Sequence, residues 1–161
     1  MKQLLAPSNL EDLKRSGLND QTIEASGIFT VPPADFKKYR LPAKAISAYA
    51  IPYPNSDMIR FRLFYEEGDS GPRYFQQKGS GNKLYIPFSI TKEILDDNAI
   101  PLYITEGEKK ALKACQEGLA CVALSGLWNW SAGEKKLLSD FEKINLKDRP
   151  VFIVPDNDFE K

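Results

Sequence analysis

The stretch that decides the fold is IPLYITEGEKKALKACQEGLACVAL, residues 100–124. It begins with a short apolar run over 100–105, continues with a helix pattern over 109–116 that Gly118 ends, and closes with a second apolar run over 121–124. A third apolar run, VFIV, occupies 151–154. Short apolar strands that alternate with helices predict a parallel α/β sheet, here over residues 100–161.

Carboxylates follow two of these predicted strands. Glu106 comes directly after the first run, and Asp156 and Asp158 follow the third in the sequence PDND. Ligands bind at the carboxyl ends of strands in open α/β sheets, so these three side chains converge if the two strands are neighbours. Oxygen ligands without histidine suit Mg²⁺ or Mn²⁺. We therefore expect Glu106, Asp156 and Asp158 to be both the metal ligands and the catalytic residues. The alternative is that Glu106 belongs to a simple turn and that Asp156 and Asp158 belong to a solvated loop.

Two different segments precede the α/β pattern. Residues 1–35 predict a helical unit of two short helices ending at Gly17 and Gly27, which either packs as a docking unit or contacts nucleic acid. Residues 36–99 predict an antiparallel β-rich subdomain. Its strand signals cover 46–53, 58–65, 73–76 and 83–87. A further helix is expected over 134–144, with its core residues at 137, 138, 141 and 144.

The zero net charge of the chain conceals a basic middle segment. Residues 36–92 carry a net charge of +6 and eleven of the eighteen aromatic residues, between ends that carry −2 and −4. Cations interleaved with aromatic rings fit single-stranded nucleic acid. The alternative is that the rings form strand core and the cations a solvated face. The predicted nucleic-acid-binding residues are Arg60, Arg62, Arg73, Lys78, Lys83 and Lys109.

Several residue types are missing or scarce. The chain contains no histidine, which excludes Ser-His-Asp triads, Cys-His pairs and histidine-ligated zinc. The two cysteines, Cys115 and Cys121, lie in an apolar stretch and predict small core residues in a reducing cytoplasm, with a disulfide between them as the alternative. No apolar run approaches the ~20 residues of a membrane span, so a cytoplasmic protein is expected.

Trp128 and Trp130 are expected to pack against the sheet, with base stacking as the alternative.

Three motifs carry a resemblance to a known family. YITEGEKKA at 103–111, VALSG at 122–126 and FIVPDND at 152–158 resemble the TOPRIM domain of topoisomerases, bacterial-type primases and some nucleases. The EGEKK variant is similar to an uncharacterised family attached to plasmid and phage primase-helicases. The resemblance implies that Glu106 is the conserved acid and that Asp156 and Asp158 are the metal-binding pair. The basic strands of 36–99 are similar to the β-rich subdomain that precedes TOPRIM in these primases.

The resemblance implies a primase-type module of a phage or mobile element. Such a module performs Mg²⁺-dependent nucleotidyl transfer on single-stranded DNA and works with nucleotides and a fused or separate helicase. A TOPRIM domain continues past its Asp-x-Asp with another helix and strand, so the sheet is expected to be truncated at its C-terminal end. The alternatives are a TOPRIM nuclease and a non-catalytic module that binds single-stranded DNA. Whether the chain is itself an enzyme stays open.

Overall fold

The computed structural model describes residues 5–133 and 136–156, and the chain forms two compact units. The first unit comprises Met1–Tyr53 and Asp57–Ser80, and the second comprises Pro54–Ser56 and Gly81–Lys161. These boundaries differ from the three predicted segments. The predicted helical unit and three of the predicted β-subdomain strands belong to one compact unit, while 83–87 lies in the other.

The first unit joins two short helices to an antiparallel sheet. Helices α1 (Pro7–Arg15) and α2 (Asp20–Ala25) confirm the predicted helical pair, and the side chain of Asn19 caps α2 by accepting a hydrogen bond from the Thr22 N–H. Four strands then lie in chain order. They are β1 (Phe29–Thr30), β2 (Ser47–Pro52), β3 (Ile59–Phe64) and β4 (Tyr74–Gln76). A 3₁₀ turn, η1 (Pro33–Asp35), separates β1 from β2.

Alternation along β3 divides that sheet into two faces. Phe61 and Leu63 are buried in the core of the unit, whereas Arg60, Arg62 and Phe64 on the opposite face are only partly covered. This is the alternation that the sequence predicts, because successive side chains of a strand point to opposite faces. The core side of β3 packs with Val31, Leu41, Ala45, Ala48 and Ala50.

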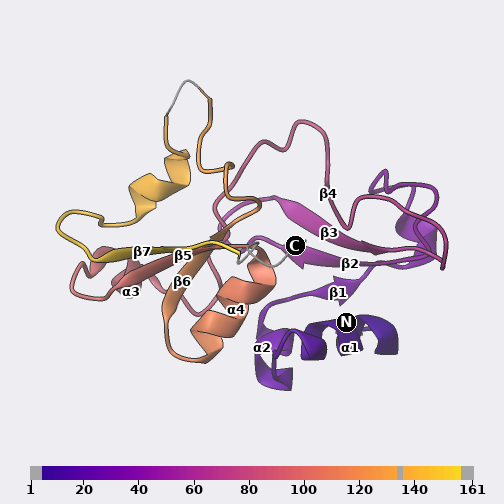
Figure 1. Cartoon of the computed structure of the whole chain (residues 1–161), viewed down its shortest axis with the longest axis horizontal. Coiled ribbons are helices and arrows are strands. Elements are labelled where there is room, and N and C mark those ends of the chain that lie inside the picture. The colour runs from indigo at the N-terminus through magenta and orange to yellow at the C-terminus, as the bar shows by residue number, and fades with distance from the viewer. Residues whose placement is uncertain (1–4, 134–135, 157–161) are drawn as a thin grey trace. The chain divides into compact units, whose positions relative to one another are not determined.

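The second unit contains the predicted parallel sheet, which confirms the mixed α/β fold class. Strands β5 (Leu102–Glu106), β6 (Ala120–Leu124) and β7 (Val151–Val154) pair in the order β6-β5-β7, and both pairings are parallel. Helix α4 (Glu108–Gln116) connects β5 to β6 and packs against both (Figure 1). Helix α3 (Lys92–Asp96) precedes β5. The first and third predicted strands are therefore neighbours.

Two secondary-structure predictions are wrong in part. Residues 83–87 form no regular strand, because only Tyr85 bridges to Ala123 of β6. In the predicted helix over 134–144, residues 134–135 lie outside the described residues, and only η2 (Ser139–Lys143) is helical, as a 3₁₀ segment. Leu137 instead bridges to Ser131 and is 56% exposed, whereas the other predicted core residues, Leu138, Phe141 and Ile144, are buried.

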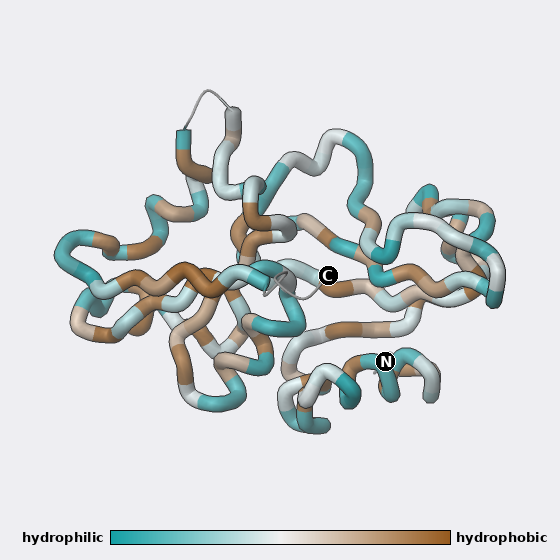
Figure 2. The backbone as a smooth tube through the Cα atoms, viewed as in Figure 1, coloured by the Kyte–Doolittle hydropathy of each residue, from teal (hydrophilic) through white to brown (hydrophobic). Residues whose placement is uncertain are grey.

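The two edges of the parallel sheet differ in exposure. Every residue of β6 is buried, and Tyr85 exchanges two backbone hydrogen bonds with Ala123 along that edge. Every residue of β7 is exposed, although all four are apolar, and the strand forms a brown stretch in Figure 2. Among the described residues, no helix is long and apolar enough to span a membrane.

Candidate metal and nucleic-acid-binding residues

The carboxyl ends of the parallel strands bring two predicted ligand segments to one edge. Glu106 is the last residue of β5 and pairs in register with Leu124 of β6, while Thr105 pairs with Val154 of β7. The Thr105 hydroxyl also donates a hydrogen bond to the Val154 carbonyl, at 3.1 Å. Asp156 follows two residues after β7. Glu106 and Asp156 therefore extend from the ends of adjacent strands.

Gly107 sets the turn between Glu106 and α4. Its φ of 90° and ψ of 138° lie in a region that glycine adopts without strain, and its N–H donates to the Leu124 carbonyl at 2.9 Å. A Cβ at this position would meet no atom within 4 Å, so the backbone angle is what requires glycine. The turn leaves Glu106 partly exposed at the sheet edge.

The two glutamates that flank Gly107 have different environments. Glu108, the first residue of α4, is only 1% exposed. Burial is the main reason that the pKa of the Tyr85 hydroxyl is raised, and the charge of Glu108 raises it further. The sequence pattern identifies Glu108 only as the start of a helix. Nothing in the EGE motif indicates that Glu108 is the buried one of the two glutamates. Glu108 faces the interior of the second unit, which leaves Glu106 as the candidate ligand.

Asp156 already has a cationic partner. Its Oδ1 accepts a hydrogen bond from the Nζ of Lys110 on α4, and both side chains are about half exposed. Asp158, the third predicted ligand, lies outside the described residues. Within 5–133 and 136–156 there is no cluster of three side chains of the metal-ligating kind.

The two described carboxylates fit the chemistry of a hard cation. Mg²⁺ is commonly held by one or two protein carboxylates, with water and substrate oxygens completing its shell. Glu106 and Asp156 supply such oxygens at one sheet edge, and no nitrogen or sulfur ligand lies among the residues that end these strands. These two residues would hold a divalent cation, if one binds here.

The predicted nucleic-acid-binding residues do not share one environment. Arg73 and Lys78 of the first unit are exposed, and Arg60 of β3 lies over the ring of Tyr74 at 4.8 Å. Lys83 and Lys109 belong to the second unit and are partly buried. The pKa of Asp140 is lowered. Burial opposes this shift, but hydrogen bonds from Lys143 and from the Leu84 N–H outweigh it, and the charge of Lys83 adds a smaller contribution.

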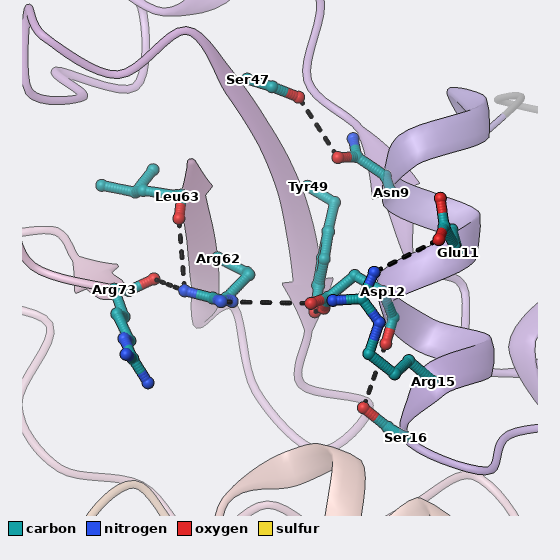
Figure 3. A network of polar contacts seen from close by, with 10 residues as sticks. All are labelled: Asn9, Glu11, Asp12, Arg15, Ser16, Ser47, Tyr49, Arg62, Leu63 and Arg73. Atoms are coloured by element: carbon teal, nitrogen blue, oxygen red, sulfur yellow. Dashed lines mark hydrogen bonds and ion pairs between the residues drawn. The ribbon is translucent and has the colours of Figure 1, made fainter. Parts of the chain in front are cut away.

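Arg62 is held inside the first unit. Its Nη1 donates to the carbonyls of Leu63 and Arg73, at 3.3 and 3.2 Å, and its Nη2 lies 4.0 Å from the Asp12 carboxylate (Figure 3). Asp12 also accepts a hydrogen bond from the Tyr49 hydroxyl at 2.8 Å. The Arg62 side chain is 17% exposed. The alternation of β3 predicts that Arg62 faces solvent or ligand, and the acid that α1 places beside it is not revealed by a strand pattern.

The loop after β6 differs from its prediction at one of its two tryptophans. Trp130 packs against the core of the second unit, as expected. Trp128, which was expected to pack against the sheet, is 82% exposed. Asn129 fixes the loop through its N–H to the Gly126 carbonyl and its side chain to the Ser125 hydroxyl. Trp128 lies at the rim of an apolar pocket of about 480 Å³ that also includes Leu137, Val151 and Ile153.

Comparisons with known proteins place the fold among primase domains. The chain is similar to the DnaG primase catalytic domain in a structure bound to single-stranded DNA, with a TM-score of 0.58 and 16% identity over 98% of this chain and 58% of that one. It is also similar to the Aquifex aeolicus primase structure of the zinc-binding and RNA polymerase domains, with a TM-score of 0.61 and 18% identity over 94% of this chain and 43% of that one.

These likenesses show a primase-related fold, and the chain spans about half the length of the two solved chains. The family model for a domain of unknown function, DUF3854, matches residues 91–161, which include the whole parallel sheet. No curated protein matches the sequence.

Proposed function

We propose that this chain is a primase-related module of DNA replication that binds single-stranded DNA and nucleotides. The proposal rests on one observation above the others. A chain with the fold of primase domains presents Glu106 and Asp156 at the carboxyl ends of adjacent parallel strands. One of the similar structures is described as bound to single-stranded DNA, which supports the choice of ligand.

The proposed chemistry is Mg²⁺-dependent nucleotidyl transfer. A divalent cation held by Glu106, Asp156 and Asp158 would stabilise phosphate charge and help to activate the attacking 3′ hydroxyl. The chain's own residues position that centre. Gly107 turns the backbone after Glu106, and the pairing of β5 with β7 sets the two ligand segments side by side. A helicase partner, a phage or mobile-element source and a cytoplasmic location are further parts of the proposal.

The DNA-binding residues in this proposal are the exposed cations. Arg73 and Lys78 are available to phosphates, and Arg60 with Tyr74 offers a stacked cation and ring. Lys83 and Lys109 remain candidates from the second unit. Arg62 supports the sheet, and its removal would act on binding through the fold.

Primer synthesis tests the catalytic part. On a single-stranded template with nucleotides and Mg²⁺, we expect short products, and we expect Glu106→Gln and Asp156→Asn to lower the rate at least 100-fold while DNA affinity is retained. Shortening of the DNA without nucleotide incorporation would instead identify a nuclease. Full activity of both variants would exclude these carboxylates from the chemistry.

Salt dependence tests the binding part. Arg73→Ala and Lys78→Ala should each reduce the slope of log K against log salt by about 0.7 for single-stranded DNA, because each removes one phosphate contact. Unchanged slopes in both variants would show that these cations do not contact the strand.

A second candidate is a module that binds DNA without catalysis. The observation that favours it is the ion pair between Lys110 and Asp156, which already satisfies one of the predicted metal ligands. DNA binding that survives Glu106→Gln, together with the absence of any primer product from the unaltered chain, would support it.

A further inference from the structure

The ion pair between Lys110 and Asp156 joins two elements that meet only through the fold. Lys110 is the third residue of α4, and Asp156 lies 46 positions later, beyond the end of β7. Lys113, one turn further along α4, pairs instead with Glu117, the residue that caps the C-terminal end of this helix. Lys110 thus brings a positive charge to the sheet edge that carries Glu106.

The ammonium group of Lys110 contacts a carboxylate that is expected to bind a metal ion. Its Nζ contacts Oδ1 of Asp156, one of the oxygens that a divalent cation would use. A divalent cation bound to this oxygen would repel the nearby ammonium group and would take up the negative charge that holds it. The two cations therefore compete for one oxygen.

The pair is also easy to open. The side chains of Lys110 and Asp156 are 51% and 43% exposed. Exposed ion pairs contribute little net free energy, because water solvates both charges once they separate. Lys110 can therefore leave at small cost and remain within reach of the same sheet edge.

We propose that Lys110 is a built-in counter-cation that occupies Asp156 in the metal-free protein and is displaced when a divalent cation binds. This inference rests on the metal-binding role in the proposed function. It adds a residue to that site and states how the charge of the site is balanced before the metal arrives. Metal binding then releases a lysine beside the place where substrate phosphates are expected.

Direct Mn²⁺ binding tests the competition, measured by the electron paramagnetic resonance signal of free Mn²⁺ in the unaltered chain and in Lys110→Gln. We expect Lys110→Gln to bind Mn²⁺ about 2–5-fold more tightly, because the competing pair is gone. Lys113→Gln is the matched control, since it removes the same charge one turn later on α4, where the lysine pairs with Glu117 and not with Asp156. Equal or weaker binding by Lys110→Gln, or an equal gain in Lys113→Gln, would overturn the proposal.

A second substitution separates direct competition from general electrostatics. In an Asp156→Asn background, Lys110→Gln should no longer change Mn²⁺ affinity, because the shared oxygen is lost. A persistent gain there would show that Lys110 acts at a distance, and would contradict the proposal.

Amine labelling gives a readout that does not depend on a variant. Lys110 should become more reactive toward an acylating reagent when Mn²⁺ is added, while Lys113 keeps its reactivity. Unchanged labelling of Lys110 at saturating Mn²⁺ would overturn the displacement. If neither the unaltered chain nor Lys110→Gln binds Mn²⁺, the metal role in the proposed function fails as well. If both bind it equally, only the role of Lys110 fails.

Discussion

The antiparallel sheet of the first unit and the parallel sheet of the second place their charged residues differently. In the first, Arg62 lies in the middle of a strand, and α1 covers it with Asp12. In the second, Glu106 and Asp156 lie at strand ends, where no strand continues to cover them. A charge within a strand is within reach of the element that packs over that face, whereas a charge at a strand end lies at the edge where open α/β sheets commonly bind ligands. For these three residues, position along the strand separates a charge that is paired within the fold from carboxylates that remain partly exposed.

The largest expected effect concerns Arg62. Arg62→Ala should lower the free energy of unfolding by about 1.5–3 kcal/mol, because it removes charge-assisted contacts from Asp12 and from two backbone carbonyls. Arg73→Ala is the matched control. It deletes an exposed side chain and keeps the carbonyl that Arg62 uses, so the change should stay within about 0.5 kcal/mol.

Urea unfolding at neutral pH measures both variants. Equal losses in the two variants would show that Arg62 is as free as Arg73. In that case Arg62 would be a candidate DNA contact like Arg73, and the contrast between paired charges within β3 and exposed charges at the ends of the parallel strands would fail.

Alkaline pH distinguishes the two units through groups that lose their protons in different pH ranges. In the second unit, burial raises the pKa of the Cys115 thiol and raises that of Cys121 to about 12, and burial also raises the pKa of Tyr85. In the first unit, burial and the neighbouring Asp12 raise the pKa of Tyr49, and that unit has no cysteine. Each group keeps its proton longer in the folded state than in the unfolded one.

A raised folded pKa gives stability that is fully present below the unfolded pKa and is lost as pH rises. The thiols should therefore reduce stability above pH about 8.5, and the tyrosines above pH about 10, by up to about 1.4 kcal/mol per pH unit for each group. Cys121→Ala should flatten the fall between pH 8.5 and 10. Tyr49→Phe should flatten it only above pH 10, after an initial loss of about 1 kcal/mol for the hydrogen bond to Asp12.

Unfolding free energies at pH 7.5, 9.5 and 11 check this order. A Tyr49→Phe variant that is already flatter at pH 9.5, or a Cys121→Ala variant that follows the unaltered chain throughout, would contradict the assignment of the two groups to the two pH ranges.

The sequence predicts the local elements well where periodicity and glycine positions agree. The strands β2, β3 and β4, the pair of N-terminal helices and the order of β5, α4, β6 and β7 all follow from apolar runs and their breaks. The pairing of β5 with β7 was conditional, because chain order alone leaves strand order open. The structure satisfies that condition, and it is what brings Glu106 and Asp156 to one edge.

The failures have a common physical cause. The expected burial of Leu137 and Trp128 came from local pattern, and both side chains are exposed. The ion pair of Arg62 with Asp12 is likewise invisible in the strand pattern, while the contact of Arg62 with nucleic acid stays a prediction. Arg62 meets Asp12 from 50 positions earlier, and Trp128 remains exposed beside a strand whose own residues are exposed. Tertiary partners of this kind leave no mark in the spacing of a single segment.

The smallest expected effect concerns the exposed strand β7. Ile153 is 67% exposed, so Ile153→Thr should change the free energy of unfolding by less than about 0.5 kcal/mol, and threonine is also favourable in strands. Val122, in the buried strand β6, is the matched position. Val122→Thr places a hydroxyl in the core and should cost about 1–3 kcal/mol.

Thermal unfolding with light scattering measures stability and association together. Because an exposed apolar edge strand favours association, Ile153→Thr should also lower scattering at high protein concentration, whereas Val122→Thr should not. A cost for Ile153→Thr as large as that for Val122→Thr would show that something covers β7 in solution. The edge strands β6 and β7 would then both be covered in solution, and the contrast in exposure between them would fail.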